Sequence, residues 1–451
     1  MFCNHLSYFY PPNNCVGIIH NKLELRKFLY NFVRNTTHVM KYYKTNKGYR
    51  AQILKRALNY STFRILGKGL YWLLQIPFSV KTKYANIPIR VTSSWEEEKD
   101  DILERLNWLS EKIIVQPEKL IKEMPAILGE EYAGQWAIYC CAMLAHACAN
   151  ISIIYPEQKC KSIESISKLI EITNTPTIRH YDTIKWKEDA ILSINGKKSH
   201  MTYLSLLAWM ISNYKMIGGD DQFDNLFHTI CRALNRRMLE SKYDLNLLSF
   251  PYKPIFLPDM LVAIIALQNY SKLYNGTYQE TIDKWILNAK TKWIHRPSGL
   301  LKSMLPGASK YKRQRKMKGS FIALNCSYLC LVNEMFALSQ YNSMKNKMVH
   351  EIEFFGERIL GIKEFTNKDP LFQLSGGDSG FTAKGLSAGG TAFALGCATF
   401  FEDWEFRSKL LRTAEVIGET VKKRGKRYYR LGDIFLTGEA VALAMRTNIK
   451  R

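Results

Sequence analysis

Carboxylates, a histidine and tyrosines stand at, or just before, the starts of apolar stretches along the chain. Such groups can act as general acids and bases, because burial and neighbouring charge push the pKa values of similar side chains apart. The strongest single carboxylate is Asp378, which lies within Gly376–Gly380, where glycines allow the backbone to approach a ligand closely. The candidate catalytic residues are Asp378, Asp259, His200 and Tyr203.

The same stretches carry residues that could hold a substrate. Tryptophan rings stack on sugars or line apolar pockets, and a cluster of cations attracts phosphate or carboxylate groups. The candidate substrate-binding residues are Gln135, Trp136, Asp182, Trp186, Tyr252, Arg313, Arg315, Asn325 and Gly380. Structural alternatives stand beside these roles: the tryptophans fit a core, His200 and Asp259 fit helix starts, and the basic loop fits a solvated surface.

Twelve helix-like segments alternate between two kinds, one with a single apolar face and one apolar on almost every side. A helix that is apolar all round must be buried, whereas a striped helix covers it from outside. The striped segments are Trp95–Ile114, Lys161–Thr173, Gln222–Ser241, Tyr278–Lys290, Ser343–Leu360 and Glu405–Lys422. The apolar segments are Gly134–Ile154, His200–Lys215, Pro258–Tyr274, Ser320–Gln340, Gly389–Phe401 and Gly432–Arg446. Six such pairs predict an all-α fold, an (α/α)6 barrel or six-hairpin toroid with the apolar helices inside.

Loop lengths place the functional end of this barrel. Loops from an apolar to a striped segment are short, such as Gly218–Asp221, whereas loops in the other direction are long, such as Gly361–Ala388. Because long loops on a rigid scaffold usually carry binding sites, we expect the site at the N-termini of the apolar helices, whose dipoles favour negative charge. Within the long loop that includes Tyr181–Lys197, the Asn195-Gly196 turn signal predicts a small β-hairpin insertion.

A basic N-terminal extension, 1–93, precedes the barrel domain expected over 94–451. Met1–Arg90 holds 15 basic residues and one acid, Glu24, and so supplies more than half of the chain's formal excess of 24 positive charges. An arm packed over the outer helices is the first interpretation. Peripheral contact with an anionic membrane is the second, because Gly69–Phe78 places Trp and Leu beside basic residues. Nucleic acid comes last, because no recognition motif accompanies the charge.

Cysteine usage and the lack of known motifs bound the chemistry. Most of the ten cysteines fall inside apolar segments and none forms a C-x-x-C pair, which favours a reduced, cytoplasmic protein without a zinc site. A docked arm would hold it at the inner membrane face. The sequence has no complete phosphate-binding loop, no dinucleotide fingerprint after a strand, no HExxH and no GxSxG, so we expect no cofactor and no metal. Trp136–Tyr155 approaches transmembrane length, but it stands where the repeat requires a core helix.

Three stretches carry a family resemblance. SHMTYLSLLAWMISNYKMIGGDDQFDNL, PDMLVAIIALQNYSKLYNGTY and GSFIALNCSYLCLVNEMFALSQY resemble helical pairs of the linalool dehydratase/isomerase-like family, and the likeness covers Glu130–Arg446. The resemblance implies an α/α six-hairpin barrel and the cofactor-free hydration, dehydration or isomerisation of terpene alcohols. It rests on the rhythm of helix pairs and scattered residues, so no catalytic residue of that family is assigned to a position here.

Three functions remain open on the sequence alone. The first is a cofactor-independent lyase or isomerase of the hydro-lyase type, acting by acid–base chemistry on a small apolar or anionic molecule. The alternative is a carbohydrate-active α/α-barrel enzyme, a glycoside hydrolase or polysaccharide lyase, with carboxylates such as Asp259 and Asp378 roughly 5–10 Å apart. The third is a non-catalytic protein that docks to a membrane or an anionic polymer, which would lack a cluster of polar groups at the mouth. The oligomeric state is not predicted.

Overall fold

The computed structural model describes residues 76, 79–80, 83–84, 87–124, 130–308, 317–365, 372–374, 381–430 and 436–451. Within these residues the chain is mostly helical, with fourteen α-helices and a few small sheets. The predicted helical class is therefore confirmed at this level.

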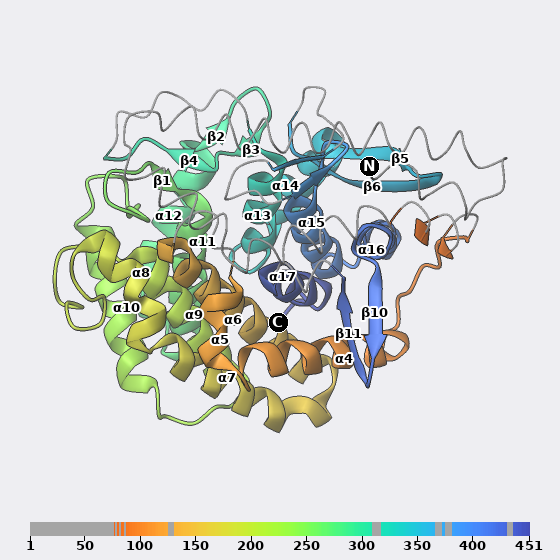
Figure 1. Cartoon of the computed structure of the whole chain (residues 1–451). Coiled ribbons are helices and arrows are strands. Elements are labelled where there is room, and N and C mark those ends of the chain that lie inside the picture. The colour runs from red at the N-terminus through yellow and green to blue at the C-terminus, as the bar shows by residue number, and fades with distance from the viewer. Residues whose placement is uncertain are drawn as a thin grey trace, which may run out of the picture.

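Six apolar helices form the centre of the molecule (Figure 1). They are α6 (Glu130–Ile154), α9 (Met201–Met216), α11 (Leu257–Leu273), α13 (Gly319–Cys330), α15 (Ala388–Phe400) and α17 (Leu436–Arg446). Each of them packs against the next in chain order, and α17 packs against α6, so the series closes on itself. α9 is buried at every residue from Met201 to Tyr214, as a helix without a polar face requires. We call these six the inner helices.

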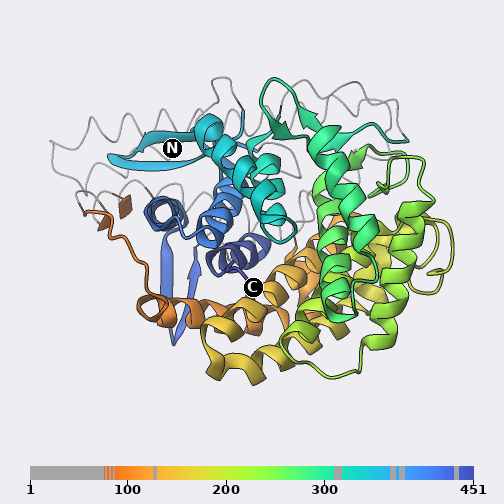
Figure 2. The same cartoon turned by 180° about the vertical axis from the view of Figure 1, so that it is seen from behind.

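Amphipathic helices cover the inner helices from outside, as Figures 1 and 2 show. They are α4 (Trp95–Ile113), α7 (Lys159–Thr173), α10 (Asp224–Leu239), α12 (Gln279–Thr291), α14 (Glu334–Met348) and α16 (Trp404–Gly418). Except for α4, which contacts α6 and α17, each packs on the inner helix that precedes it in the chain. α10 shows the striped pattern: it buries Phe227, Ile230 and Leu234 and exposes Arg232. Shorter helical segments are α5 (Pro117–Glu123), α8 (Pro176–Trp186) and the 3-10 turn η3 (Pro156–Gln158).

The structure interrupts the apolar segment predicted over Ser320–Gln340. α13 and α14 are separate helices, because the Asn333 side chain between them accepts a hydrogen bond from Phe336 N and caps α14. The striped helix predicted over Ser343–Leu360 is wrong beyond Met348, where the chain continues as β-strands. An internal cap residue thus decided a boundary that hydrophobic content alone did not show.

The structure contains short β-strands, but none at the Asn195-Gly196 turn signal within the described residues. The hairpin predicted within Tyr181–Lys197 is wrong, because Pro176–Trp186 forms α8 and turns follow it. Thr175 caps this helix and a proline occupies its first position, and these helix-start signals prevailed over the turn signal. The striped helix predicted over Glu405–Lys422 ends at Gly418 and is followed by a hairpin.

The described strands form one five-stranded antiparallel sheet and three two-stranded ones. The larger sheet has the order β5-β6-β9-β8-β7 and contains β5 (Val349–Phe354), β6 (Glu357–Lys363), β7 (Phe372–Leu374), β8 (Phe381–Ala383) and β9 (Leu386–Ser387). The pairs are β1 (Ile255–Phe256) with β4 (Met304–Leu305), β2 (Ile294–His295) with β3 (Leu300–Leu301), and β10 (Thr420–Lys423) with β11 (Lys426–Tyr429). The long loop predicted before α15 therefore carries most of the larger sheet.

The described part of the N-terminal extension packs against this sheet. Ile76 and Val80 are fully buried in a small second core with Phe354 of β5 and Val416 of α16. Lys83 forms an ion pair with Glu419 at 3.3 Å. For these residues the structure agrees with an arm packed on the domain. Most of 1–86 lies outside the described residues, so membrane contact and nucleic-acid binding stay predictions.

Buried ion pairs fasten α4 to α16 and α17. Glu98 accepts a hydrogen bond from Arg407 Nη1 at 2.5 Å and another from Arg446 Nε at 2.6 Å. Arg105 Nη1 donates to Glu439 Oε1 at 2.9 Å. These pairs join residues 309 to 348 positions apart, so they hold the two ends of the helical region together. We call this cluster the seam, and its members are Glu98, Asp101, Arg105, Arg407, Glu439 and Arg446.

One described helix is long and apolar enough to cross a membrane. It covers Ala133–Ile154 within α6, has a mean hydropathy of 1.7, and 83% of its most apolar window is buried inside the protein. Ala137, Ala142 and Ala145 are fully buried, and such small side chains let neighbouring helices approach closely. In this structure the segment is a core helix, as the repeat predicted.

Candidate functional site

A half-buried carboxylate lies where the inner helices begin. Asp259 stands in the first turn of α11, one residue after Pro258. Thr202, in the first turn of α9, donates a hydrogen bond from Oγ1 to Asp259 Oδ2 at 2.9 Å. A carboxylate in a first turn is also stabilised by the positive end of the helix dipole. Two neighbouring inner helices therefore hold this acid in place.

A pair of tyrosines crosses the middle of the closed series. Tyr139 of α6 and Tyr328 of α13 meet hydroxyl to hydroxyl at 2.6 Å. α6 and α13 are the first and the fourth of the six inner helices, so the two side chains reach across from opposite members. Each tyrosine lies nine residues after the first residue of its helix, roughly 13 Å along the helix axis. The pair thus lies deeper in the molecule than the helix N-termini, and we call it the tyrosine floor.

A third phenol comes from α8. The Tyr181 side chain is 2% exposed, and its hydroxyl has no hydrogen-bond partner among the described residues. A Cβ atom at Gly134 of α6 would lie 2.9 Å from both Ile178 O and Tyr181 Cδ1, closer than real Cβ atoms approach. Glycine at 134 is therefore what allows α8 to lie so close to α6. We call this region the mouth, and its residues are Gln135, Trp136, Tyr139, Tyr181, Thr202, Asp259 and Tyr328.

The carboxylate and the three phenols influence one another. Burial raises the pKa of Tyr139, Tyr181 and Tyr328, and the negative charge of Asp259 adds to the rise at each of them. The three hydroxyls accordingly stay protonated at neutral pH and can donate hydrogen bonds. A base within electrostatic reach of several O–H donors is suited to acid–base chemistry on an uncharged substrate.

A histidine between two acids lies behind Tyr181. His200 precedes α9 in the left-handed conformation, with φ of 46°, which a non-glycine residue keeps only when its surroundings hold it. Its Nδ1 is 2.5 Å from Asp182 Oδ2, and its Nε2 is 3.3 Å from Glu188 Oε1. The Trp186 ring packs beside it, with centroids 5.4 Å apart. His200 is fully buried, and its hydrogen bond holds the Asp182 carboxylate next to Tyr181 in the chain.

The two acids around His200 differ in their readiness to take up a proton. Burial raises the pKa of Asp182 in spite of its hydrogen bond to His200. Burial opposes ionisation of Glu188 as well, but hydrogen bonds from Lys198 and His200 prevail and lower its pKa.

Several buried polar atoms at this end of the inner helices have no partner among the described residues. They are Gln135 Oε1, Tyr181 OH, Asp182 Oδ1, Trp186 Nε1 and Asn325 Oδ1. Buried polar atoms in folded proteins are nearly always hydrogen-bonded, to protein, water or ligand. The Asn325 amide nitrogen does bond the protein, at the carbonyls of Leu301 and Lys302. These atoms are the positions that a bound polar molecule or ordered water would satisfy.

The structure brings most of the described candidate residues to this end of the molecule. Asp259, Gln135 and Trp136 belong to the mouth, and the Trp136 ring meets Tyr139 edge to face at 6.4 Å. The candidates that lie behind or beside the mouth are Asp182, Trp186, His200 and Asn325. Asp378, Gly380, Arg313 and Arg315 lie outside the described residues, so their assigned roles stay predictions.

Two candidate residues do not reach the mouth. The Tyr203 hydroxyl donates to Thr173 O of the outer helix α7 at 3.2 Å, so this side chain fastens α9 to its outer neighbour. Tyr252 is 82% exposed in a left-handed turn. The helical period carries Tyr203 away from Thr202, which faces Asp259, and Tyr252 projects into solvent. We therefore remove both from the site.

Sequence reasoning missed Tyr139, Thr202 and Tyr328. Tyr139 and Tyr328 stand in segments that are apolar on every side, where a phenol is more often a core residue. One available signal was their equal distance from the helix starts, but the predicted starts of these two segments, Gly134 and Ser320, differ from the observed ones and conceal it. The meeting of α6 with α13 is a tertiary contact that spacing along the chain does not reveal.

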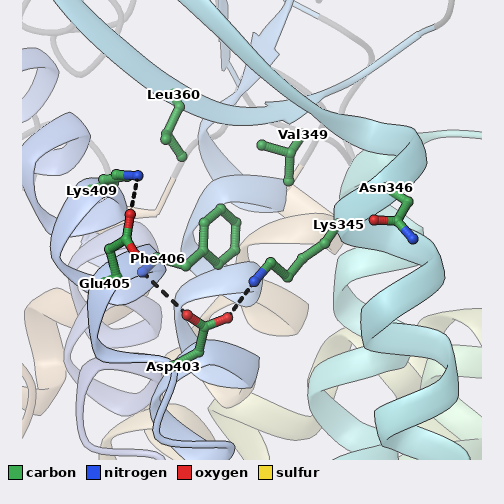
Figure 3. Close-up of a pocket in the computed structure, with 8 residues that line it drawn as sticks. All are labelled: Lys345, Asn346, Val349, Leu360, Asp403, Glu405, Phe406 and Lys409. Atoms are coloured by element: carbon green, nitrogen blue, oxygen red, sulfur yellow. Dashed lines mark hydrogen bonds and ion pairs between the residues drawn. The ribbon is translucent and has the colours of Figure 1, made fainter.

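A separate pocket lies on the outer surface between α14, α16 and the β5–β6 hairpin (Figure 3). Its volume is about 300 Å³, and its lining includes Val349, Leu360 and Phe406. Asp403 forms an ion pair with Lys345 and accepts a hydrogen bond from Phe406 N, as the dashed lines show. Its acids Asp403 and Glu405 are paired with Lys345 and Lys409, and it lies on the outer side of the amphipathic helices, so it adds no acid–base group to the site.

No protein-family model matches this chain, and no curated protein matches it either. Within the described residues no group of three or more His, Cys, Asp or Glu side chains is placed to hold a metal ion.

Proposed function

We propose that this chain is a cofactor-independent acid–base enzyme of the lyase or isomerase type, with its active site at the mouth. The observation that carries the proposal is that Asp259, held by Thr202, lies within electrostatic reach of three protonated tyrosine hydroxyls. The unpartnered buried atoms of Gln135 and Tyr181 add groups that a polar substrate would satisfy.

The finer fold assignment belongs to the same proposal. We propose an (α/α)6 barrel, because six apolar helices pack in a closed series and amphipathic helices cover them. In such a barrel all inner N-termini share one end. Their dipoles would then stabilise the negative charge of Asp259 and negative charge that develops on a substrate.

A dehydration fits these groups. Asp259 takes the proton from the carbon beside a C–OH group while a tyrosine hydroxyl donates its proton to the departing oxygen. The C–H and C–O bonds break, a C=C bond forms, and water leaves. The proton on Asp259 then returns to the phenolate, so the site is restored without a cofactor. Hydrogen bonding between Tyr139 and Tyr328 polarises the donating hydroxyl.

The lining of the mouth indicates the substrate class. The Trp136 ring, which meets Tyr139 edge to face, gives the mouth an aromatic lining. A small, largely apolar alcohol fits this lining, in line with the resemblance to the linalool dehydratase/isomerase-like family. A sugar-cleaving mechanism needs a second carboxylate. Its predicted source, Asp378, lies outside the described residues, so that alternative is not advanced.

The test is a product assay on the full chain with linalool and other terpene alcohols, read by gas chromatography, beside an oligosaccharide panel. We expect alkene or isomerised alcohol from the terpenes, and a loss of about 10²-fold or more in rate for Asp259→Asn, with a smaller loss for Tyr139→Phe. Asp283→Asn, on the exposed side of the outer helix α12, is the matched control and should keep the rate. Activity that survives Asp259→Asn, or release of sugars alone, would reject the proposal.

A further inference from the structure

The opposite end of the inner helices holds a second buried polar cluster. Arg451 Nη2 donates to His146 Nδ1 of α6 at 2.8 Å and to Asn213 Oδ1 of α9 at 2.9 Å. His146 Nε2 lies 2.9 Å from Asn448 Oδ1. His146 and Asn213 stand in the second half of their helices, so this cluster lies beyond the floor formed by Tyr139 and Tyr328. We call it the far end, with members His146, Asn150, Trp209, Asn213, Asn448 and Arg451.

The guanidinium of Arg451 has only neutral partners among the described residues. Burial, and then the positive charge of Arg451, lowers the pKa of His146 to about 3, so the imidazole is uncharged at neutral pH. Its Nδ1 accepts from Arg451, and the hydrogen on its Nε2 goes to Asn448. Burial lowers the pKa of Arg451 to about 10, and no acid contributes to that value. A buried cation without a counter-charge is costly, and proteins usually pair it.

Hydrogen-bond donors at the far end are also left over. Arg451 Nη1, Asn213 Nδ2, Trp209 Nε1 and both polar side-chain atoms of Asn150, Nδ2 and Oδ1, are buried, and none has a partner among the described residues. The Trp209 ring lies 4.9 Å from the His146 ring, and Asn150 follows His146 by one turn on the same face of α6. Four N–H groups beside an uncompensated positive charge form a donor set suited to an anion.

The helix dipoles do not remove this imbalance. The C-terminal ends of α9 and α11 carry partial negative charge, which favours a nearby cation. That effect is confined to the last turn and is weaker than the desolvation of a buried ion. In addition, no carbonyl of the described residues in those turns accepts a hydrogen bond from Arg451 Nη1.

We propose that the far end binds one small anion, such as a halide or formate, between Arg451, Asn150, Asn213 and Trp209. The anion balances the guanidinium and accepts the leftover N–H groups. It thereby holds residues 447–451 against α6 and α9 and fills the core of the inner helices beyond the tyrosine floor. This inference stands on different residues from the mouth and does not depend on the proposed reaction.

The test is an iodide titration of the full chain at constant ionic strength, with gluconate as the balancing anion, because gluconate is too large for a compact buried site. Iodide quenches tryptophan fluorescence on contact. The Trp209 signal is taken as the difference between the wild type and Trp209→Phe, and we expect its quenching to saturate. Chloride and formate should compete with it. Thermal unfolding in chloride against gluconate gives a readout that does not need Trp209, with a higher Tm expected in chloride.

Two substitutions decide the outcome. Asn150→Ala should raise the half-saturating iodide concentration at least tenfold, and Arg451→Gln should remove saturation and the chloride-dependent rise in Tm. Lys450→Gln is the matched control: its side chain is exposed and pairs with Glu334 on the surface, so binding should not change. The Asn150 side chain bonds no described residue, so Asn150→Ala tests binding even if Arg451→Gln fails to fold. Linear quenching, or equal Tm in both salts, would mean that water alone occupies the far end and would overturn the proposal.

Discussion

The seam and the mouth both bury charged and polar groups, yet they treat them in opposite ways. In the seam each buried acid meets an arginine, as Glu98 meets Arg407 and Arg446. At the mouth and behind it, Tyr181, Asp182 and Gln135 keep atoms without any described partner. Leaving a buried donor or acceptor unpaired costs free energy, whereas pairing it recovers most of that cost.

The difference separates two roles that buried polar side chains play in this protein. Complete pairing in the seam fixes α4 against α16 and α17, and nothing there is left for a ligand to bond. Incomplete pairing at the mouth keeps groups ready for a molecule that is not part of the chain. The pairing state of a buried polar group, and not its residue type, is therefore the better guide to function in this protein.

The largest effect is expected for Arg407→Met in the seam. Its loss leaves Glu98 buried with one arginine fewer, and breaking a buried ion pair costs about 3–5 kcal/mol. Lys409→Met on the same helix is the control: its pair with Glu405 is exposed, so at most about 0.5 kcal/mol should be lost. Urea unfolding measures both variants. Equal losses would show that the seam is no more than a surface network.

Asp101→Asn should change how stability depends on pH. Burial favours the neutral form of Asp101, but the charges of Arg446 and Arg105 prevail and lower its pKa to about 2. Because this pKa is lower than the value near 4 in the unfolded chain, ionised Asp101 stabilises the fold at any pH above about 4. This stabilisation is lost as the pH falls from 4 toward 2. The shift corresponds to about 2 kcal/mol. Between pH 2 and 6, the unfolding free energy of the variant should not show this acid-induced decrease. Parallel plots of unfolding free energy against pH for the variant and the wild type would contradict a lowered pKa at Asp101.

The same change of aspartate to asparagine at Asp182, behind the mouth, should alter the pH dependence of stability in the opposite direction. Burial raises the pKa of Asp182, so the folded state loses stability as the pH rises through that raised value. Asp182→Asn removes this loss and keeps an acceptor for His200, so the stability of the variant relative to the wild type should increase from pH 4 to 7. We expect a change smaller than that of Asp101→Asn. A decrease over this range would place Asp182 with the seam residues.

The smallest effect is expected for Tyr181→Phe. The Tyr181 hydroxyl has no described partner, so its removal should change the unfolding free energy by less than about 0.5 kcal/mol. Tyr203→Phe is the matched control, because that hydroxyl bonds Thr173 O and its loss should cost about 1 kcal/mol. Thermal or urea unfolding compares them. Similar losses would show that the Tyr181 hydroxyl is already satisfied in the fold.

Much of the helical framework could be predicted from the alternation of apolar and striped segments. Burial of α9 from Met201 to Tyr214 follows directly from its lack of a polar face. The errors arose where local signals compete: Asn333 starts a new helix inside an apolar run, and Thr175 with a following proline starts α8 where a hairpin was expected. Asp259 could be selected from its place at a helix start, whereas Tyr203 could not be excluded.

The sequence by itself determined which segments are buried, because a helix without a polar face has nowhere else to go. It also determined the excess of positive charge in the first 90 residues and the acid at the start of α11. Only the tertiary structure decided which buried polar atoms find partners. Tyr139 meets Tyr328 at a separation of 189 positions, and Glu98 meets Arg446 at 348. Pairing depends on distances between helices, which residue order along one helix does not contain.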